Sequence, residues 1–405
     1  KTYSTVRRAL ELILGPDKLQ GLSEKGLTAL FREHKARGQI EFVTFHQAYG
    51  YEEFIEGIRP VLDQGADAEV RYELHDGVFK RIALRAAAEG LRPETAEPGK
   101  TEAMAPRARV LHAINNKRGG TTSFAFSTKT PQYVLIIDEI NRGNMSKILG
   151  ELMTLLEKDK RLTGTSELTL PLSYSPGQHF GVPPNLHILG TMNTADRSIA
   201  LMDVALRRRF TFEELMPDPG ILREELRARV PSKPFIDLVV EVFESLNDRI
   251  RFLYDRDHQL GHSYFLEAEN AEALRLVFVD RVIPMLQEYF YGAWDKICTV
   301  LGCPYSAEGE PRRGGAHLVD KAGTKTYLWP LVSARTFLEK ETLGFDHEDY
   351  EDRVDHFVSP KFQRGGLSEE ELYRTFLSIL VLDAATFQTR LDALLQASSP
   401  STESP

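Results

Sequence analysis

Runs of apolar residues divide the chain into a first part in which strands and helices alternate and a second part that is mainly helical. The strongest signal is the uninterrupted run at 133–137, whose lack of polar alternation predicts a strand buried on both faces. A second buried strand is predicted at 186–190, with a helix over 143–158 between the two. This alternation predicts an α/β fold with a parallel sheet that carries helices on both faces.

Weaker patterns predict the elements around this sheet. An amphipathic helix comes first and ends at Gly15-Pro16. A hairpin is predicted over 68–80, with its turn at Asp76-Gly77. The stretch 87–130 has little periodicity and is rich in Ala, Pro and Gly, so we expect a loop there. The remaining predictions are a strand at 41–45, a helical turn at 51–58, helices at 272–291 and 369–396, irregular chain at 304–345 and a disordered tail at 398–405.

Composition and charge narrow the class of protein. Of 405 residues, 42% are hydrophobic and 27% charged, as in ordinary globular chains. The 50 basic and 59 acidic residues give a net charge of −9. This balance argues against a protein that binds nucleic acid through a cationic surface over the whole chain. No apolar run approaches the roughly 20 residues of a membrane span, and nothing resembles a signal peptide. Cys298 and Cys303 suit neither a disulfide framework nor a zinc site, which predicts two incidental thiols and a reducing, cytoplasmic location.

An acidic pair, Asp138-Glu139, ends the strongest predicted strand. Phosphate-transfer folds place a Mg²⁺ ligand and a water-activating base at such a strand end. Asp138 would hold the Mg²⁺ water shell, and Glu139 would polarise the attacking water. A solvated turn is the alternative, because a strand followed by two carboxylates is a weak motif on its own.

A polar segment at 191–198 follows the next buried strand. At this strand end Asn193 could hydrogen-bond the γ-phosphate or the attacking water. Asp196 and Arg197 could form a local ion pair or reach a neighbouring subunit. The alternative is a helix N-cap, a position that Asn, Thr and Asp favour.

Three consecutive arginines, Arg207, Arg208 and Arg209, lie a few residues further on. They cannot all face the same way, so at least one projects from the core. An arginine offered across an interface stabilises charge on a transferring phosphoryl group. The alternative is a solvated cationic helix end that complements the helix dipole.

The first two residues, Lys1-Thr2, stand directly before the amphipathic helix, as at the end of a phosphate-binding loop GxxxxGK[ST]. Lys1 would then reach the β- and γ-phosphates, and the Thr2 hydroxyl would bind Mg²⁺. Alone the dipeptide carries almost no information, and we expect a glycine-rich loop upstream of Lys1 to complete it.

Together these segments resemble the McrB-type motor subunits of modification-dependent (type IV, McrBC-like) restriction systems, a branch of the AAA+ ring NTPases. The resemblance covers about residues 1–303, and its hallmark is the phrase Met192-Asn-Thr-Ala-Asp-Arg-Ser198. The other matching phrases, in the order of the family, are Lys1-Thr2-Tyr3, Phe45-His-Gln47, Tyr51-Glu-Glu-Phe-Ile-Glu-Gly-Ile-Arg-Pro60, Ile137-Asp-Glu-Ile-Asn-Arg-Gly-Asn144, Leu206-Arg-Arg-Arg-Phe210 and Gly261-His-Ser-Tyr-Phe265.

The resemblance implies roles for individual residues. Catalytic roles fall on the base Glu139, on Asn193 at the sensor position, and on the arginines that serve an adjacent subunit's nucleotide, Arg207, Arg208 and Arg209. Thr2 and Asp138 would bind the metal. The nucleotide would be contacted by Lys1, Thr2, Asp138, Asp196 and Arg197, and by the segment that opens the helical lid, Gly261, His262 and Ser263.

The resemblance also implies an organisation and a function. The chain would comprise an AAA+ P-loop NTPase core over 1–230 with an insertion at about 60–130, a helical lid over 231–303, a mainly helical extension over 304–397 and the tail. It would hydrolyse GTP, or else ATP, with Mg²⁺, in the homo-oligomeric, hexameric ring typical of the family. Its partners would be a separate McrC-like nuclease subunit and DNA, read by an upstream domain or by the assembled complex; no membrane is implied.

Two other functions stay open at this point. One is an ATP-dependent remodelling chaperone of the same superfamily (MoxR-like), and the other is a non-hydrolysing, nucleotide-gated scaffold. No nuclease pattern and no histidine–cysteine metal cluster stands out in the sequence. We therefore expect the chain alone not to cleave DNA.

Overall fold

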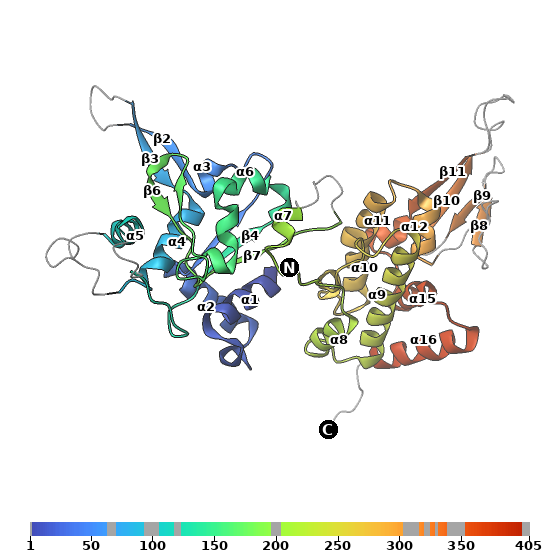
Figure 1. Cartoon of the computed structure of the whole chain (residues 1–405). Coiled ribbons are helices and arrows are strands. Elements are labelled where there is room, and N and C mark those ends of the chain that lie inside the picture. Colours follow the sequence, from blue (N-terminus) through green and yellow to red (C-terminus); the bar gives the residue numbers. More distant parts are fainter. Residues whose placement is uncertain are drawn as a thin grey trace, which may run out of the picture. The chain divides into compact units, whose positions relative to one another are not determined.

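The computed structural model of the chain describes residues 2–62, 70–92, 105–116, 123–195, 204–302, 316–319, 325–328, 331–337 and 353–398. Contacts within the chain divide it into two compact units (Figure 1). Unit 1 is Lys1–Glu214 and unit 2 is Leu215–Pro405.

A three-stranded parallel sheet forms the centre of unit 1. Its strands are β1 (Ile40–Thr44), β4 (Tyr133–Asp138) and β7 (Leu186–Gly190), in the order β1-β4-β7. The middle strand, β4, pairs with both neighbours, and its residues from Tyr133 to Ile137 are buried. The predicted parallel sheet with a strand buried on both faces is therefore confirmed.

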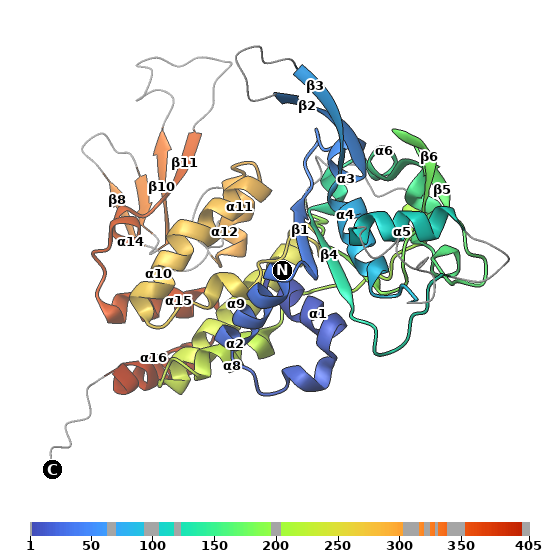
Figure 2. The ribbon, with the colours of Figure 1, turned by 90° about the vertical axis from the view of Figure 1, so that its left-hand side faces the viewer.

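Alternate side chains of β4 enter two different cores. Val134 and Ile136 pack with Ala9 of α1 (Thr2–Leu14) on one face, beside α2 (Glu24–Ala36). Leu135 and Ile137 belong to the larger core that includes α4 (Val78–Ala88), on the other face (Figure 2). Burying each such aliphatic side chain contributes about 1.5–3 kcal/mol. The helices on both faces thus hold β4 in a single position.

The hairpin lies earlier in the chain than predicted. Strand β2 (Glu56–Leu62) pairs with β3 (Val70–Asp76), and Val78 begins α4 instead of a second strand. The turn predicted at Asp76-Gly77 is wrong: Gly77 is the N-cap of α4, and a Cβ there would lie 2.3 Å from the Phe54 backbone. The residues after Gly77 bury one face at helical spacing, which favours the helix.

The loop predicted over 87–130 contains a helix, α5 (Pro106–Asn115), so the prediction is wrong there. Proline stands at the first helical position, where its missing N–H costs nothing, so its presence in this stretch does not exclude a helix. The predicted helix over 143–158 is α6 (Met145–Leu149) followed by a 3-10 helix (Gly150–Leu156). Other elements of unit 1 are the 3-10 helices Pro16–Leu19, Ile140–Arg142 and Lys158–Lys160, α3 (Tyr51–Phe54), β5 (Leu170–Leu172), β6 (Ser175–Phe180) and α7 (Val204–Arg207).

A buried ion-pair network fixes the hairpin to the rest of unit 1. The Lys80 ammonium lies 2.6 Å from Glu56 Oε2 and 3.0 Å from Asp76 Oδ1. Glu56 also accepts hydrogen bonds from the Ser175 hydroxyl (2.9 Å) and the Tyr174 amide (3.1 Å). Lys80 and Glu56 are both 0% exposed. Their charges are therefore compensated by each other and by hydrogen bonds, as buried charges require.

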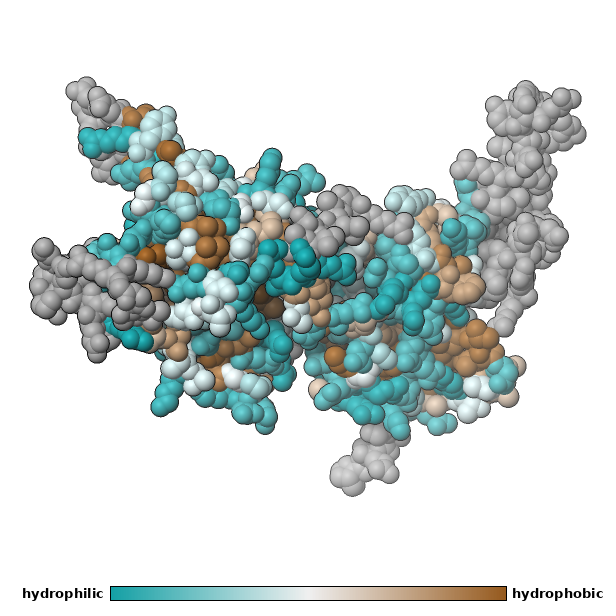
Figure 3. Space-filling model, in the orientation of Figure 1, coloured by the Kyte–Doolittle hydropathy of each residue, from teal (hydrophilic) through white to brown (hydrophobic). Residues whose placement is uncertain are grey.

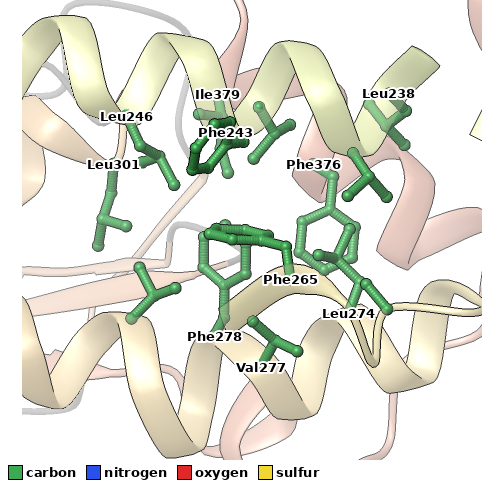
Figure 4. Packing of buried hydrophobic residues seen from close by; sticks show 14 of the residues in the cluster. Leu238, Phe243, Leu246, Phe265, Leu274, Val277, Phe278, Leu301, Phe376 and Ile379 are labelled. Atoms are coloured by element: carbon green, nitrogen blue, oxygen red, sulfur yellow. The ribbon is translucent and has the colours of Figure 1, made fainter. Parts of the chain in front are cut away.

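Unit 2 is built around one helical core. Phe243, Phe265, Phe278 and Phe376 pack against one another in its centre (Figure 4). Phe376 comes from the predicted extension and the other three from the predicted lid, so these segments share a core. The helices are α8 (Pro219–Arg227), α9 (Lys233–Leu253), a 3-10 helix (His262–Phe265), α10 (Ala271–Val277), a π-helix (Phe278–Val282), α11 (Ile283–Tyr289), α12 (Trp294–Val300), α14 (Pro360–Arg364), α15 (Glu369–Ile379) and α16 (Ala384–Ser398).

Unit 2 also contains a four-stranded antiparallel sheet in the order β11-β10-β9-β8. Its strands are β8 (Ala316–Val319), β9 (Lys325–Leu328), β10 (Val332–Phe337) and β11 (Arg353–Val358). The prediction of irregular chain at 304–345 is wrong for the first three. After β11, the described part of the extension consists of the helices α14, α15 and α16, as predicted.

The helices, the surface and the cysteine of the described residues bear on the predictions made from composition. None of the described helices is long and apolar enough to cross a bilayer. The face of the molecule in Figure 3 is mainly hydrophilic, with separate apolar patches.

Cys298 is buried, and burial raises the pKa of its thiol to about 12. Cys303 and residues 399–405 of the predicted tail lie outside the described residues.

We predict that Glu56→Leu destabilises unit 1 by about 3 kcal/mol, because it leaves a buried ammonium without its nearest counter-charge. The matched control is Glu33→Ala, which breaks the exposed ion pair with Arg37 and should cost less than about 1 kcal/mol. Denaturant unfolding of the full chain gives the free energy of unfolding of unit 1 in each variant. Equal costs would contradict the role given to the network.

Candidate active site

Two polar loops leave the carboxyl ends of β4 and β7, which are neighbours in the sheet. Ile137 pairs with Gly190, so Asp138 and Thr191 lie side by side at the strand ends. The Thr191 hydroxyl donates a hydrogen bond to Asp138 Oδ1. The sheet therefore brings the two predicted clusters together at one edge, where ligands bind in open α/β sheets.

Glu139 turns sharply away from the strand. Its backbone is left-handed (φ 53°, ψ 46°), a conformation that costs a non-glycine residue roughly 1–2 kcal/mol. The Glu139 amide lies 3.4 Å from Thr191 Oγ1, and its carbonyl accepts from the Arg142 amide at 2.9 Å. Its carboxylate accepts from Arg142 Nε at 3.2 Å. Strained backbone held by surrounding hydrogen bonds is typical of functional sites.

Asn193 joins this group through a neighbouring amide. Asn141 Nδ2 donates to the Asn193 carbonyl at 3.2 Å and so connects the loop after β4 to the loop after β7. Asn193 is half-buried. Asp138, Glu139 and Asn193 are thus the predicted residues that the sheet places together. Thr191 and Asn141 were not predicted as site residues, although adjacent strand ends signal that polar residues of both loops will meet.

The three arginines have different surroundings. Arg209 pairs with Glu157 at 2.7 Å, and its side chain is only 14% exposed. Arg207 and Arg208 are exposed, and the Arg207 guanidinium lies 5.4 Å from the centre of the Phe212 ring. Arg209 therefore contributes to packing within unit 1, whereas Arg207 and Arg208 reach solvent.

Buried hydrogen bonds in unit 2 hold the predicted lid segment, Gly261, His262 and Ser263. The Asn247 side chain donates to the Leu260 carbonyl (3.1 Å) and accepts from the Leu260 amide (2.7 Å). His262 Nδ1 accepts from the Asp218 amide at 3.3 Å. Burial lowers the pKa of His262, which favours the uncharged ring, and the acceptor role of Nδ1 leaves Nε2 to carry the proton. The segment therefore presents a ring N–H donor.

The remaining predicted site residues are not placed by the structure. Lys1, Asp196 and Arg197 lie outside the described residues, and Thr2 begins α1 with an undescribed side chain. Among the residues that are described, no group of three or more His, Cys, Asp or Glu could hold a metal ion.

Comparison with known proteins identifies the family. Residues 25–210 match the AAA domain of the dynein-related subfamily, and residues 238–298 match the alpha-helical lid domain of McrB. Over 278 residues the chain is 32% identical to the type IV methyl-directed restriction enzyme EcoKMcrB subunit of Escherichia coli (strain K12). This chain is an AAA+ protein of the McrB type.

The McrB-type resemblance and the AAA+ fold predicted from sequence are thus confirmed. The match to the E. coli protein covers 65% of this chain and 50% of that protein. The chain is also 25% identical over 160 residues to component YdiS of the type II restriction enzyme BsuMI of Bacillus subtilis (strain 168), which covers 36% of this chain and 46% of that protein. It therefore spans about half the length of these relatives.

We predict that Arg209→Ala lowers the free energy of unfolding by about 1–2 kcal/mol, because Glu157 loses a charged hydrogen-bond donor. Arg207→Ala and Arg208→Ala serve as matched controls and should change stability by less than about 0.5 kcal/mol, since both side chains are exposed. Denaturant unfolding of the three variants checks this. A similar loss of stability in all three variants would contradict the assignment of Arg209 to packing and of Arg207 and Arg208 to the surface.

Proposed function

We propose that this McrB-type chain hydrolyses nucleoside triphosphates and works as the motor subunit of a restriction complex. The observation that carries the proposal is the meeting of Asp138, Glu139 and Asn193 at one edge of a buried parallel sheet. The names of both relatives, each part of a restriction enzyme, support the biological setting.

Asp138 fits a magnesium site. Its Oδ1 is occupied by the Thr191 hydroxyl, and Oδ2 takes no hydrogen bond from the part of the chain that the structure describes. Mg²⁺ prefers such carboxylate oxygens together with substrate phosphates. Asp138 and Thr2 would hold the ion, which when bound would neutralise charge on the phosphates.

Glu139 and Asn193 would activate and orient the water that attacks the γ-phosphate. Glu139 accepts the proton of the attacking water, and the Asn193 amide orients that water in line with the γ-phosphate. Lys1 binds the β- and γ-phosphates. His262 offers its Nε2 proton, together with Gly261 and Ser263, to the nucleotide from the lid.

A ring supplies the rest of the site. Arg207 or Arg208, both exposed, serves the nucleotide of an adjacent copy, in a homo-hexamer. Asp196 and Arg197 contact nucleotide from the same loop as Asn193. Arg209 is the weakest candidate for this role because it is engaged by Glu157 within its own unit.

The proposed nucleotide is GTP and the proposed location is the cytoplasm. A separate McrC-like nuclease subunit would dock on the ring, and DNA would be read by an upstream domain or by the assembled complex. The net charge of −9 supports this division of labour, since tight unaided DNA binding needs a cationic surface.

The central test is Glu139→Gln. The amide cannot accept a proton, so we predict that kcat falls by about 10²–10⁴-fold while nucleotide binding is retained. Asp138→Asn should instead weaken Mg²⁺-dependent binding. Steady-state hydrolysis and fluorescent-nucleotide binding by the full-length protein measure the two effects.

Glu33→Gln, an identical change on the exposed face of α2, is the control and should leave turnover unchanged. Equal and small effects of Glu139→Gln and Asp138→Asn on turnover would refute the assignment of the acidic pair.

The choice of nucleotide is tested separately. We predict that GTP is hydrolysed faster than ATP at matched saturation, and that each competes for the same site. Turnover of both nucleotides over a concentration series gives the ratio of the two kcat/KM values. Comparable values would favour an ATP-using remodelling function.

A further inference from the structure

Thr191 touches both members of the acidic pair through one hydroxyl group. Its O–H donates to Asp138 Oδ1, and its oxygen faces the Glu139 amide at 3.4 Å. The two contacts are compatible, because a hydroxyl has one proton to donate and lone pairs left to accept. A single oxygen atom therefore contacts the side chain of one carboxylate residue and the backbone of the other.

The main chain of Thr191 bonds to the residues on either side of the acidic pair. Its amide donates to the Ile137 carbonyl, and its carbonyl accepts from the Ile140 amide, both at 2.9 Å. Thr191 thus bonds to every residue from Ile137 to Ile140. The main-chain bonds hold the loop in place, and the hydroxyl is the part that reaches the acidic pair.

We propose that Thr191 is a positioning residue that orients both carboxylates of the proposed hydrolysis site. By occupying Oδ1, its hydroxyl restrains the Asp138 carboxylate and leaves Oδ2 as the oxygen that would hold the ion. By accepting from the Glu139 amide, it favours the left-handed turn from which the Glu139 carboxylate projects. This role rests on the proposed function, and it concerns a residue to which neither motif nor comparison assigns one.

The test compares Thr191→Val with Thr191→Ser. Valine keeps the branched shape and deletes the hydroxyl, whereas serine keeps the hydroxyl and deletes a methyl group. Loss of a hydrogen bond that orients a metal ligand typically costs about 10–100-fold in affinity or activity. We expect that loss in kcat/KM for valine and a near-normal kcat/KM for serine. Thr28→Val, at an exposed position of α2, controls for the chemical change.

A second measurement does not depend on hydrolysis. Mn²⁺, used as a probe for Mg²⁺, is titrated by electron paramagnetic resonance into the full-length protein bound to a non-hydrolysable GTP analogue. The dissociation constant should rise about 10-fold or more in Thr191→Val and remain near wild type in Thr191→Ser. Thermal unfolding of each variant shows whether folding is preserved.

Unchanged Mn²⁺ affinity in a folded Thr191→Val variant would overturn the proposal. So would equal losses in the valine and serine variants, since these would point to packing of the side chain alone. If the wild-type protein binds nucleotide and Mn²⁺ without turnover, the proposed hydrolysis fails, and the Mn²⁺ titration still decides the role of Thr191.

Discussion

Burial of β4 on both faces is the constraint on which the rest of unit 1 depends. Its alternate side chains belong to two cores, so a slip of one residue would place each set against the wrong helices. The register with β1 and β7 is fixed for the same reason. The carboxyl end of β4 is therefore a fixed point, and Asp138 and Glu139 are held where the loop from β7 meets them.

The same property explains what could be predicted from sequence. A strand covered on both sides needs an uninterrupted apolar run, and the run at 133–137 is visible without any structure. The polar residues that follow two such runs must share one edge, so the meeting of Asp138 and Asn193 was predictable. Thr191 was not singled out, because its importance lies in a contact between side chain and backbone that no spacing along the chain reveals.

Other elements escaped prediction for different physical reasons. Strand β3 is exposed on both faces, so its alternation said nothing about its partner, which is β2 and not the segment after Gly77. The strands β8 to β10 are short and lie in a stretch without clear periodicity, and their pairing depends on residues distant in sequence. The different surroundings of Arg207 and Arg209 depend on Glu157 and Phe212, to which no local pattern points.

The left-handed backbone at Glu139 makes a trade-off between stability and catalytic activity. Glycine would adopt this conformation without steric cost, and asparagine with little, so either would relieve the turn of its strain. A search for heat-resistant variants that screened only for folding would therefore enrich such replacements at position 139. Each would discard the carboxylate for which the strain is tolerated, so thermostability and turnover would have to be selected together in this protein.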